Sequence, residues 1–206
     1  ALGDATHPLD PDQAVEFGRP LDDLDVVAVG DQANLDHARG GLHELDAVAP
    51  RQACAAGEQR DEAAASEGHE LGLHAWDHYR WQTHIDRMVG EIIYQGLLQG
   101  FEVISHSVGT FPICSAAPGW RSTDSALLEK AKFPFRYNSD CRGTSIFYPV
   151  VKGKTLSQPQ IPTTLPTFDE VLGRERVDRE NYNEYLISLM REESLNVLTI
   201  HAEVEG

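Results

Sequence analysis

The sequence predicts an α/β fold in which parallel strands alternate with helices over residues 61–206. Two observations lead to this prediction. Short apolar runs that suit strands recur at residues 70–74, 135–138 and 196–202. Segments with the 3.6-residue period of a helix lie between those runs. Strands that alternate with helices are typical of parallel β/α architecture, because a crossover helix returns the chain to the start of the next strand.

The first predicted elements are a helix and a strand. Residues 61–67 are rich in alanine and favour a helix, which Gly68 can end. Residues 70–74 then alternate in character, as expected of a short strand.

The clearest helical pattern covers residues 84–98. Its apolar side chains recur at spacings of three and four residues: Ile85, Met88, Val89, Ile92 and Ile93. This stripe predicts the face that packs against the rest of the fold. We expect the helix to end near Gly100, because glycine is common just after a helix.

Further elements are predicted downstream. A helix is expected to begin near residues 122–123, whereas residues 158–166 are proline-rich and predict a loop or an edge. Asp178 is a predicted N-cap for a helix that runs to about Glu193. Residues 196–202 are β-branched and apolar and form the best strand candidate in the chain.

Residues 1 to about 60 differ from the remainder. Residues 1–70 hold 16 Asp and Glu against 4 Arg and no Lys, whereas residues 71–206 hold 17 acidic and 13 basic side chains. Low hydrophobicity with high net charge is typical of a segment whose burial cannot offset the entropy of ordering it. We therefore expect an atypical acidic N-terminal segment, poorly ordered or irregular, in which only residues 25–29 resemble a strand.

The composition also excludes several classes of function. The net charge is −16, and a field of this sign repels phosphate backbones, so a nucleic-acid partner is not expected. No apolar run approaches the roughly 18 residues of a membrane-spanning helix, and the N-terminus lacks the features of a secretory signal. The three cysteines fit neither a disulfide framework nor a zinc ribbon. A soluble, cytoplasmic protein is predicted.

Two histidines after the strand at 70–74 form the sharpest candidate site. His74 and His78 are four residues apart, so on one helical turn they share a face and could bind a single cation. Neutral imidazole suits zinc and similar divalent metals. The alternative is that they are polar loop residues, or that one is a satisfied core residue. Asp77, between them, could orient a ring or simply form a turn.

A third histidine is predicted to meet this pair. Ligands of parallel β/α folds gather beyond the carboxyl ends of the strands, and both His74 and His201 follow predicted strands. His201 could protonate a leaving amine, because imidazole ordinarily titrates near neutral pH. A partly buried histidine bonded to a loop is the alternative.

Two other segments carry candidate polar groups. Residues 117–121 predict a tight turn whose backbone N–H groups and Arg121 could hold an oxyanion or a carboxylate, unless Arg121 is an ordinary surface residue. Asp140 follows the strand at 135–138 and is expected to pair with Arg121. Cys141 is interpreted as a small buried residue rather than a nucleophile.

Five segments in order carry a resemblance to a known family. They are residues 72–78 (GLHAWDH), 114–121 (CSAAPGWR), 136–143 (RYNSDCRG), 160–171 (QIP, then LPTFDEV) and 199–206 (TIHAEVEG). Together they resemble lipid-linked aminosugar deformylases of the polysaccharide deacetylase (NodB-like) family. The resemblance covers roughly residues 60–206 and implies a distorted (β/α) barrel, of which this chain would hold a catalytic domain incomplete at both ends.

The resemblance also implies a reaction. A divalent metal such as zinc would be held by His74 and His78 together with an aspartate, and His201 would be the general acid. Arg121 and Asp140 would position base and acid, and Trp120 and Tyr137 would contact the sugar.

The implied substrate is a 4-deoxy-4-formamido-arabinose on undecaprenyl phosphate, which would lose formate. This step would belong to the aminoarabinose modification of lipid A that protects against polymyxin. The enzyme would act at the inner face of the bacterial inner membrane as a peripheral protein.

One motif of the family has no counterpart in this sequence. The family begins with a strand that bears Asp-x-Asp, and Asp23-Leu24-Asp25 has this spacing without the preceding apolar strand. We therefore hypothesise that residues 1 to about 60 replace the family's usual N-terminus. Two alternatives to the deformylase remain: an N-acetyl sugar deacetylase of the same family, and a catalytically inactive remnant that lacks Asp-x-Asp.

Overall fold

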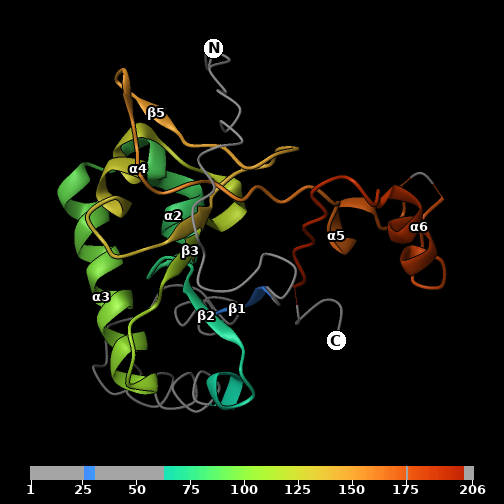
Figure 1. Ribbon diagram of the computed structural model, residues 1–206, viewed down its shortest axis with the longest axis horizontal. Coiled ribbons are helices and arrows are strands. Elements are labelled where there is room, and N and C mark those ends of the chain that lie inside the picture. The colour runs from blue at the N-terminus through green and yellow to red at the C-terminus, as the bar shows by residue number, and fades with distance from the viewer. Residues whose placement is uncertain (1–25, 31–62, 175, 202–206) are drawn as a thin grey trace, which may run out of the picture.

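A four-stranded parallel sheet lies at the centre of the computed structural model, which describes residues 26–30, 63–174 and 176–201 (Figure 1). The strand order is β1-β2-β3-β4, and every neighbouring pair is parallel. The strands are β1 (Val26–Gly30), β2 (Glu70–Leu73), β3 (Cys114–Ala116) and β4 (Tyr137–Ser139). Because all four strands run the same way, their carboxyl ends meet at one edge of the sheet. The predicted parallel α/β class is confirmed.

Three predicted strands are present within two residues of their expected positions. Residues 25–29 correspond to β1, residues 70–74 to β2 and residues 135–138 to β4. Strand β3 was not predicted. The expectation of an irregular segment over residues 1–60 lies, apart from β1, outside the described residues.

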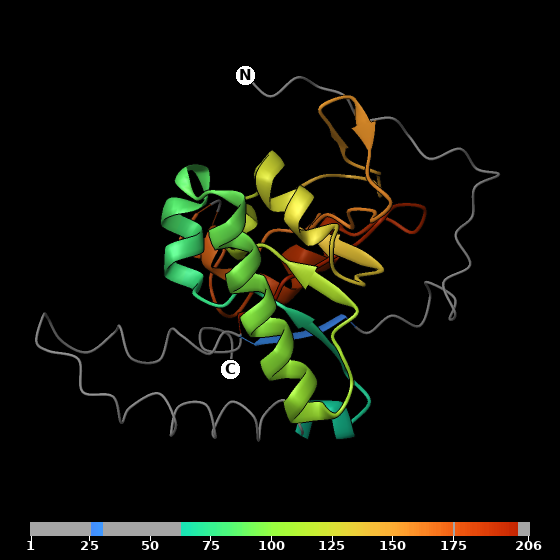
Figure 2. The same cartoon turned by 90° about the vertical axis from the view of Figure 1, so that its left-hand side faces the viewer.

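Helix α3 (Gly90–Val108) packs against β2 and covers one face of the sheet (Figure 2). It follows α2 (His78–His84) and the 3-10 turn η2 (Ile85–Arg87), so the single helix predicted over residues 84–98 is wrong at both ends. Gly100 does not end the helix. It is buried against β2, where an added Cβ would lie 2.5 Å from Leu73 Cδ1. The helix ends at Gly109, whose φ of 70° suits a residue without a side chain.

The main hydrophobic core lies between α3, the sheet and the loop before β4. Ile93, Leu97, Gly100 and Ile104 form the buried stripe of α3. Two of the residues predicted for that stripe are exposed instead, Val89 by 63% and Ile92 by 41%. The pattern therefore located a helix in this region but misjudged its start, and with it the buried face.

Helix α4 (Asp124–Lys130) begins where the sequence predicts. Thr123 is its N-cap, and the Thr123 hydroxyl accepts a hydrogen bond from the Ala126 N–H at 3.2 Å. A short hairpin of β5 (Val150–Val151) and β6 (Lys154–Thr155) follows further along the chain.

The C-terminal segment lies on the side of the sheet opposite α3 (Figures 1 and 2). Residues 158–166 are a loop that bridges to β4 through the parallel partners Asn138 and Gln160, as expected of a proline-rich edge. Helices α5 (Phe168–Val171) and α6 (Tyr182–Leu189) enclose a second apolar cluster.

Two predictions for this segment are wrong. Residues 196–201 form no strand in the described structure; the Val197 carbonyl instead accepts from the Thr164 and Leu165 N–H groups of the preceding loop at 3.0 and 2.9 Å. Helix α6 is also shorter than predicted. Asp178 lies before it and accepts hydrogen bonds from the N–H groups of Glu180 and Asn181 in a turn.

Among the helices in the described part of the chain, none is both long enough and apolar enough to cross a membrane.

Candidate metal and acid–base site

His74 and His78 meet at the carboxyl end of β2, with ring centroids 5.2 Å apart. The prediction that they share one helical turn is wrong. His74 lies in the connection after β2, and His78 is the first residue of α2. Between them Ala75 adopts a left-handed φ of 67°, and the Asp77 carboxylate caps α2 by accepting from the Arg80 N–H at 2.8 Å. The turn therefore brings the two imidazoles together, and Asp77 is a helix cap.

The tautomer of His74 is set by the neighbouring strand. Its Nδ1 lies 3.1 Å from the Ala116 carbonyl oxygen, which can only accept, so Nδ1 donates and carries the proton. This leaves the Nε2 lone pair of the neutral ring unprotonated. Burial, followed by the positive charge of His78, lowers the pKa of His74 to about 3. A neutral histidine whose other nitrogen bonds a carbonyl has the arrangement usual for a zinc ligand.

The pair fits two ligands of a divalent metal. Within the described residues no group of three or more His, Cys, Asp and Glu side chains is close enough to hold an ion. A third protein ligand would therefore have to come from outside the described ranges.

His201 pairs with a carboxylate that the sequence analysis did not select. Its Nδ1 lies 3.0 Å from Asp169 Oδ1, on the first turn of α5. Burial alone would raise the pKa of Asp169, but hydrogen bonds from Thr167 and His201 outweigh that effect and lower it.

Asp140 pairs with Lys130, and the predicted pair with Arg121 is not formed. Lys130 Nζ lies 2.5 Å from Asp140 Oδ1, while the Gln160 amide donates to Asp140 Oδ2 at 3.1 Å. Both charged side chains are buried. Lys130 lies one turn after Ala126 on the buried face of α4, and this face meets Asp140 just after the end of β4.

Arg121 lies at the surface and faces Asp86, with 3.9 Å between Nη2 and Oδ1. The turn before it forms as predicted: Pro118–Trp120 is a 3-10 turn in which Gly119 and Trp120 both have positive φ. The Arg121 carbonyl accepts from the Trp81 indole N–H at 2.9 Å, which ties the turn to α2.

The two predicted sugar-contacting residues have different surroundings. Trp120 is partly exposed; its indole N–H donates to Thr163 Oγ1 at 3.0 Å, and the Arg142 guanidinium lies 4.7 Å from the centre of its ring. Tyr137 is buried, and its hydroxyl donates to Glu70 at the start of β2.

Sequence reasoning missed Lys130 and Asp169. A signal existed for Lys130, because it follows Ala126 at helical spacing and so belongs to the buried face of a predicted helix. No local pattern could have linked Asp169 with His201, because 32 residues separate them.

Comparison with known proteins gives related sequences and a related fold. No protein-family model matches the chain. The probable 4-deoxy-4-formamido-L-arabinose-phosphoundecaprenol deformylase ArnD of Shewanella sediminis is 50% identical over 139 residues, 68% of this chain and 44% of that protein. The protein of the same name from Wigglesworthia glossinidia brevipalpis is 41% identical over 145 residues, 69% of this chain and 50% of its own length.

The chain thus spans about half the length of these curated relatives. A putative polysaccharide deacetylase from Mycobacterium smegmatis superposes with a TM-score of 0.54 at 17% identity, over 72% of this chain and 55% of that structure. At this level of identity, the match bears on the fold alone. Over the residues compared, the chain is therefore a homologue of the ArnD deformylases, and its fold is that of the polysaccharide deacetylases.

Proposed function

We propose that this chain carries the metal-binding and proton-donating part of an amide hydrolase that removes formate from a formamido sugar on undecaprenyl phosphate. The observation that carries the proposal is the His74–His78 pair, in which Ala116 holds His74 as the neutral tautomer with Nε2 unprotonated. The name that the two relatives share, 4-deoxy-4-formamido-L-arabinose-phosphoundecaprenol deformylase, supplies the substrate class. The modification of lipid A and the resistance to polymyxin belong to the same proposal.

His74 and His78 would hold a divalent metal such as zinc. When bound there, such an ion polarises an amide carbonyl and promotes ionisation of a water molecule. His74 is suited to this role because burial lowers its pKa and so favours the neutral ring that binds a metal.

His201 would protonate the departing amine. Asp169 occupies Nδ1 of His201, so Nε2 is the atom that would deliver the proton. Water supplies the oxygen that bonds to the formyl carbon and releases one proton to solvent; the amide C–N bond breaks, the nitrogen gains the proton from His201, and the acyl carbon leaves as formate. Asp169 would act by orienting the ring of His201.

The turn at residues 117–121 would form one wall of the sugar site. Trp120 presents a partly exposed ring, which is the kind of surface on which a sugar packs. Asp140 and Arg121 are proposed as positioning groups, Asp140 through its buried pair with Lys130 and Arg121 through Asp86. A cytoplasmic, peripheral location at the inner membrane would bring this site to a lipid-linked substrate.

The test combines metal content with product identity. The chain is titrated with zinc or cobalt, and release of formate from the formamido sugar lipid is measured beside release of acetate from the N-acetyl analogue. Metal uptake with formate release supports the proposal, whereas acetate release alone points to a deacetylase. Metal uptake without either product indicates an inactive remnant.

His78→Ala should abolish metal uptake, and His84→Ala is its matched control. His84 is an exposed histidine at the other end of the same helix, so its removal should leave metal content unchanged. Unchanged metal content in His78→Ala would reject the ligand assignment.

A further inference from the structure

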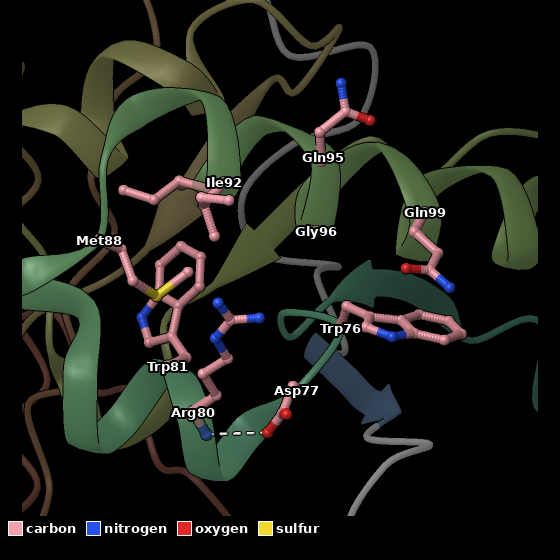
Figure 3. A pocket seen from close by; sticks show the side chains of 10 residues that line it. Trp76, Asp77, Arg80, Trp81, Met88, Ile92, Gln95, Gly96 and Gln99 are labelled. Carbon is pink, nitrogen blue, oxygen red and sulfur yellow. Dashed lines mark hydrogen bonds between the residues drawn. The ribbon is translucent and has the colours of Figure 1, made fainter.

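A cavity of about 190 Å³ lies between α2, α3 and the loop that joins β2 to α2 (Figure 3). Trp81, Met88 and Ile92 form one side of it, and Trp76 lies on the other side. Pockets that enclose a whole drug-sized ligand usually measure ~300–1,000 Å³. This cavity is therefore large enough for a short apolar fragment of a ligand, with the rest of the molecule outside.

The cavity shares a wall with the histidine pair. Trp76 and Asp77, which line it, are two of the three residues that separate His74 from His78. The loop that joins His74 to His78 therefore also forms part of the cavity lining.

The outer edge of the cavity is apolar and open to solvent. Ile92 is 41% exposed, and the neighbouring Val89 is 63% exposed at the start of α3. The exposed part of each side chain provides apolar surface where a ligand could leave the cavity.

The positively charged side chain of Arg80 lies among these apolar residues. The Arg80 side chain rises from α2 between Trp81 and Trp76 and points toward α3 (Figure 3). The guanidinium forms no ion pair within the described part of the chain. The other charged group of the lining is Asp77, whose Oδ1 is engaged by the Arg80 N–H as the cap of α2. Gln95 and Gln99 complete the polar lining, and the Gln95 amide donates to Glu91 on the surface of α3.

We propose that this cavity binds the phosphate-proximal end of the polyprenyl chain of the substrate, with Arg80 on the phosphate. The inference rests on the proposed function, and it names how the lipid carrier is recognised. In a sugar-phosphate-prenyl substrate the phosphate lies between the sugar and the lipid. Both proposed polar groups come from α2, of which His78 is the first residue and Arg80, in the lining of the apolar cavity, is the third. Guanidinium groups bind phosphate oxygens through paired hydrogen bonds, so Arg80 suits this position.

Farnesyl phosphate, a short and soluble prenyl phosphate, is the probe. Its binding to the full chain is followed by tryptophan fluorescence, because Trp76 and Trp81 line the cavity. Saturable binding is expected both with zinc and in EDTA. Farnesol and inorganic phosphate should each bind at least about tenfold more weakly, because each lacks one of the two recognised groups.

Two variants and two matched controls locate the site. Arg80→Gln and Ile92→Asn should each weaken binding about tenfold. Arg87→Gln removes a similar exposed arginine whose side chain is 82% exposed, and Ile187→Asn alters an isoleucine on α6 that is 67% exposed. Neither control should change the affinity.

The outcomes separate this inference from the proposed function. Equal binding by farnesol, equal weakening in the control variants, or loss of binding in EDTA would each overturn the cavity assignment, the last because it would place the phosphate on the metal. Formate release without saturable farnesyl phosphate binding removes the cavity proposal alone. Site-specific binding without formate release retains the cavity and rejects the deformylase.

Discussion

Lys130 and Asp140 form an ion pair that is almost fully removed from solvent, with side chains 2% and 1% exposed and 2.5 Å between Nζ and Oδ1. The Lys130 ammonium also lies 5.4 Å from the centre of the Trp81 ring, so the pair joins α4, the end of β4 and α2. Burying two charges is costly, and removing one of them leaves the other without compensation.

Lys130→Met should therefore lower the free energy of unfolding by about 3–5 kcal/mol. The double variant Lys130→Met, Asp140→Leu should recover much of this loss, because no isolated charge remains. Urea unfolding measures both. The control is Lys132→Met, at a side chain that is 56% exposed, where a change below ~1 kcal/mol is expected. If Lys130→Met and Lys132→Met cost the same, the pair is not buried as described.

Gly100→Ala should destabilise the protein, because the added Cβ would lie 2.5 Å from Leu73 Cδ1 and force α3 away from β2. A cost of about 1–3 kcal/mol is expected from such overpacking. Gly96→Ala on the same helix meets only the Trp76 Cβ at 3.9 Å, so it should be neutral or stabilise by up to ~1 kcal/mol through helix propensity. Thermal unfolding compares the two variants, and the opposite order of stability would contradict the described helix packing.

The thiols of Cys114 and Cys141 should be unreactive in the folded protein. Burial raises the pKa of Cys114 to about 12 and that of Cys141 to about 11. Less than about one per cent of either thiol is then ionised at pH 8, and the thiolate is the form that reacts. In a Cys54→Ser variant, a thiolate-selective reagent should therefore label the protein slowly until urea unfolds it.

The direction of the pH effect follows from these raised values. Labelling of the folded protein should accelerate as pH rises toward 11, because thiolate appears only there. Rapid labelling at pH 8 without denaturant would show that the thiols are accessible and ionised, against this prediction.

Asp169→Asn should lower formate release about tenfold if His201 is the general acid. The carboxylate holds the His201 ring through Nδ1, so its loss should lower kcat and leave KM for the sugar lipid unchanged. The split between kcat and KM is the decisive measurement, because a purely structural role for Asp169 would also raise KM. Glu184→Gln, at an exposed acid on α6, is the control and should leave both parameters unchanged.

Sequence patterns were informative where neighbouring residues decide the structure. The strand at 70–74 and the helix that begins after Thr123 were found because alternation and an N-cap are local signals. The same logic failed for residues 196–202, which have strand-like composition. In the structure Val197 bonds to the loop at Thr164, and no strand within the described ranges pairs with residues 196–201. Composition describes which conformation suits a segment, but pairing requires a partner that composition does not supply.

The sequence by itself determined the parallel α/β class and the two histidines that follow β2. Tertiary structure alone decided how those histidines meet, through the left-handed Ala75 and the Ala116 carbonyl, and which charges pair: Asp140 with Lys130 and His201 with Asp169. The physical reason is distance along the chain. Helix and strand periodicity arise from contacts within a few residues, whereas ion pairs and imidazole tautomers depend on groups that only the folded chain brings together.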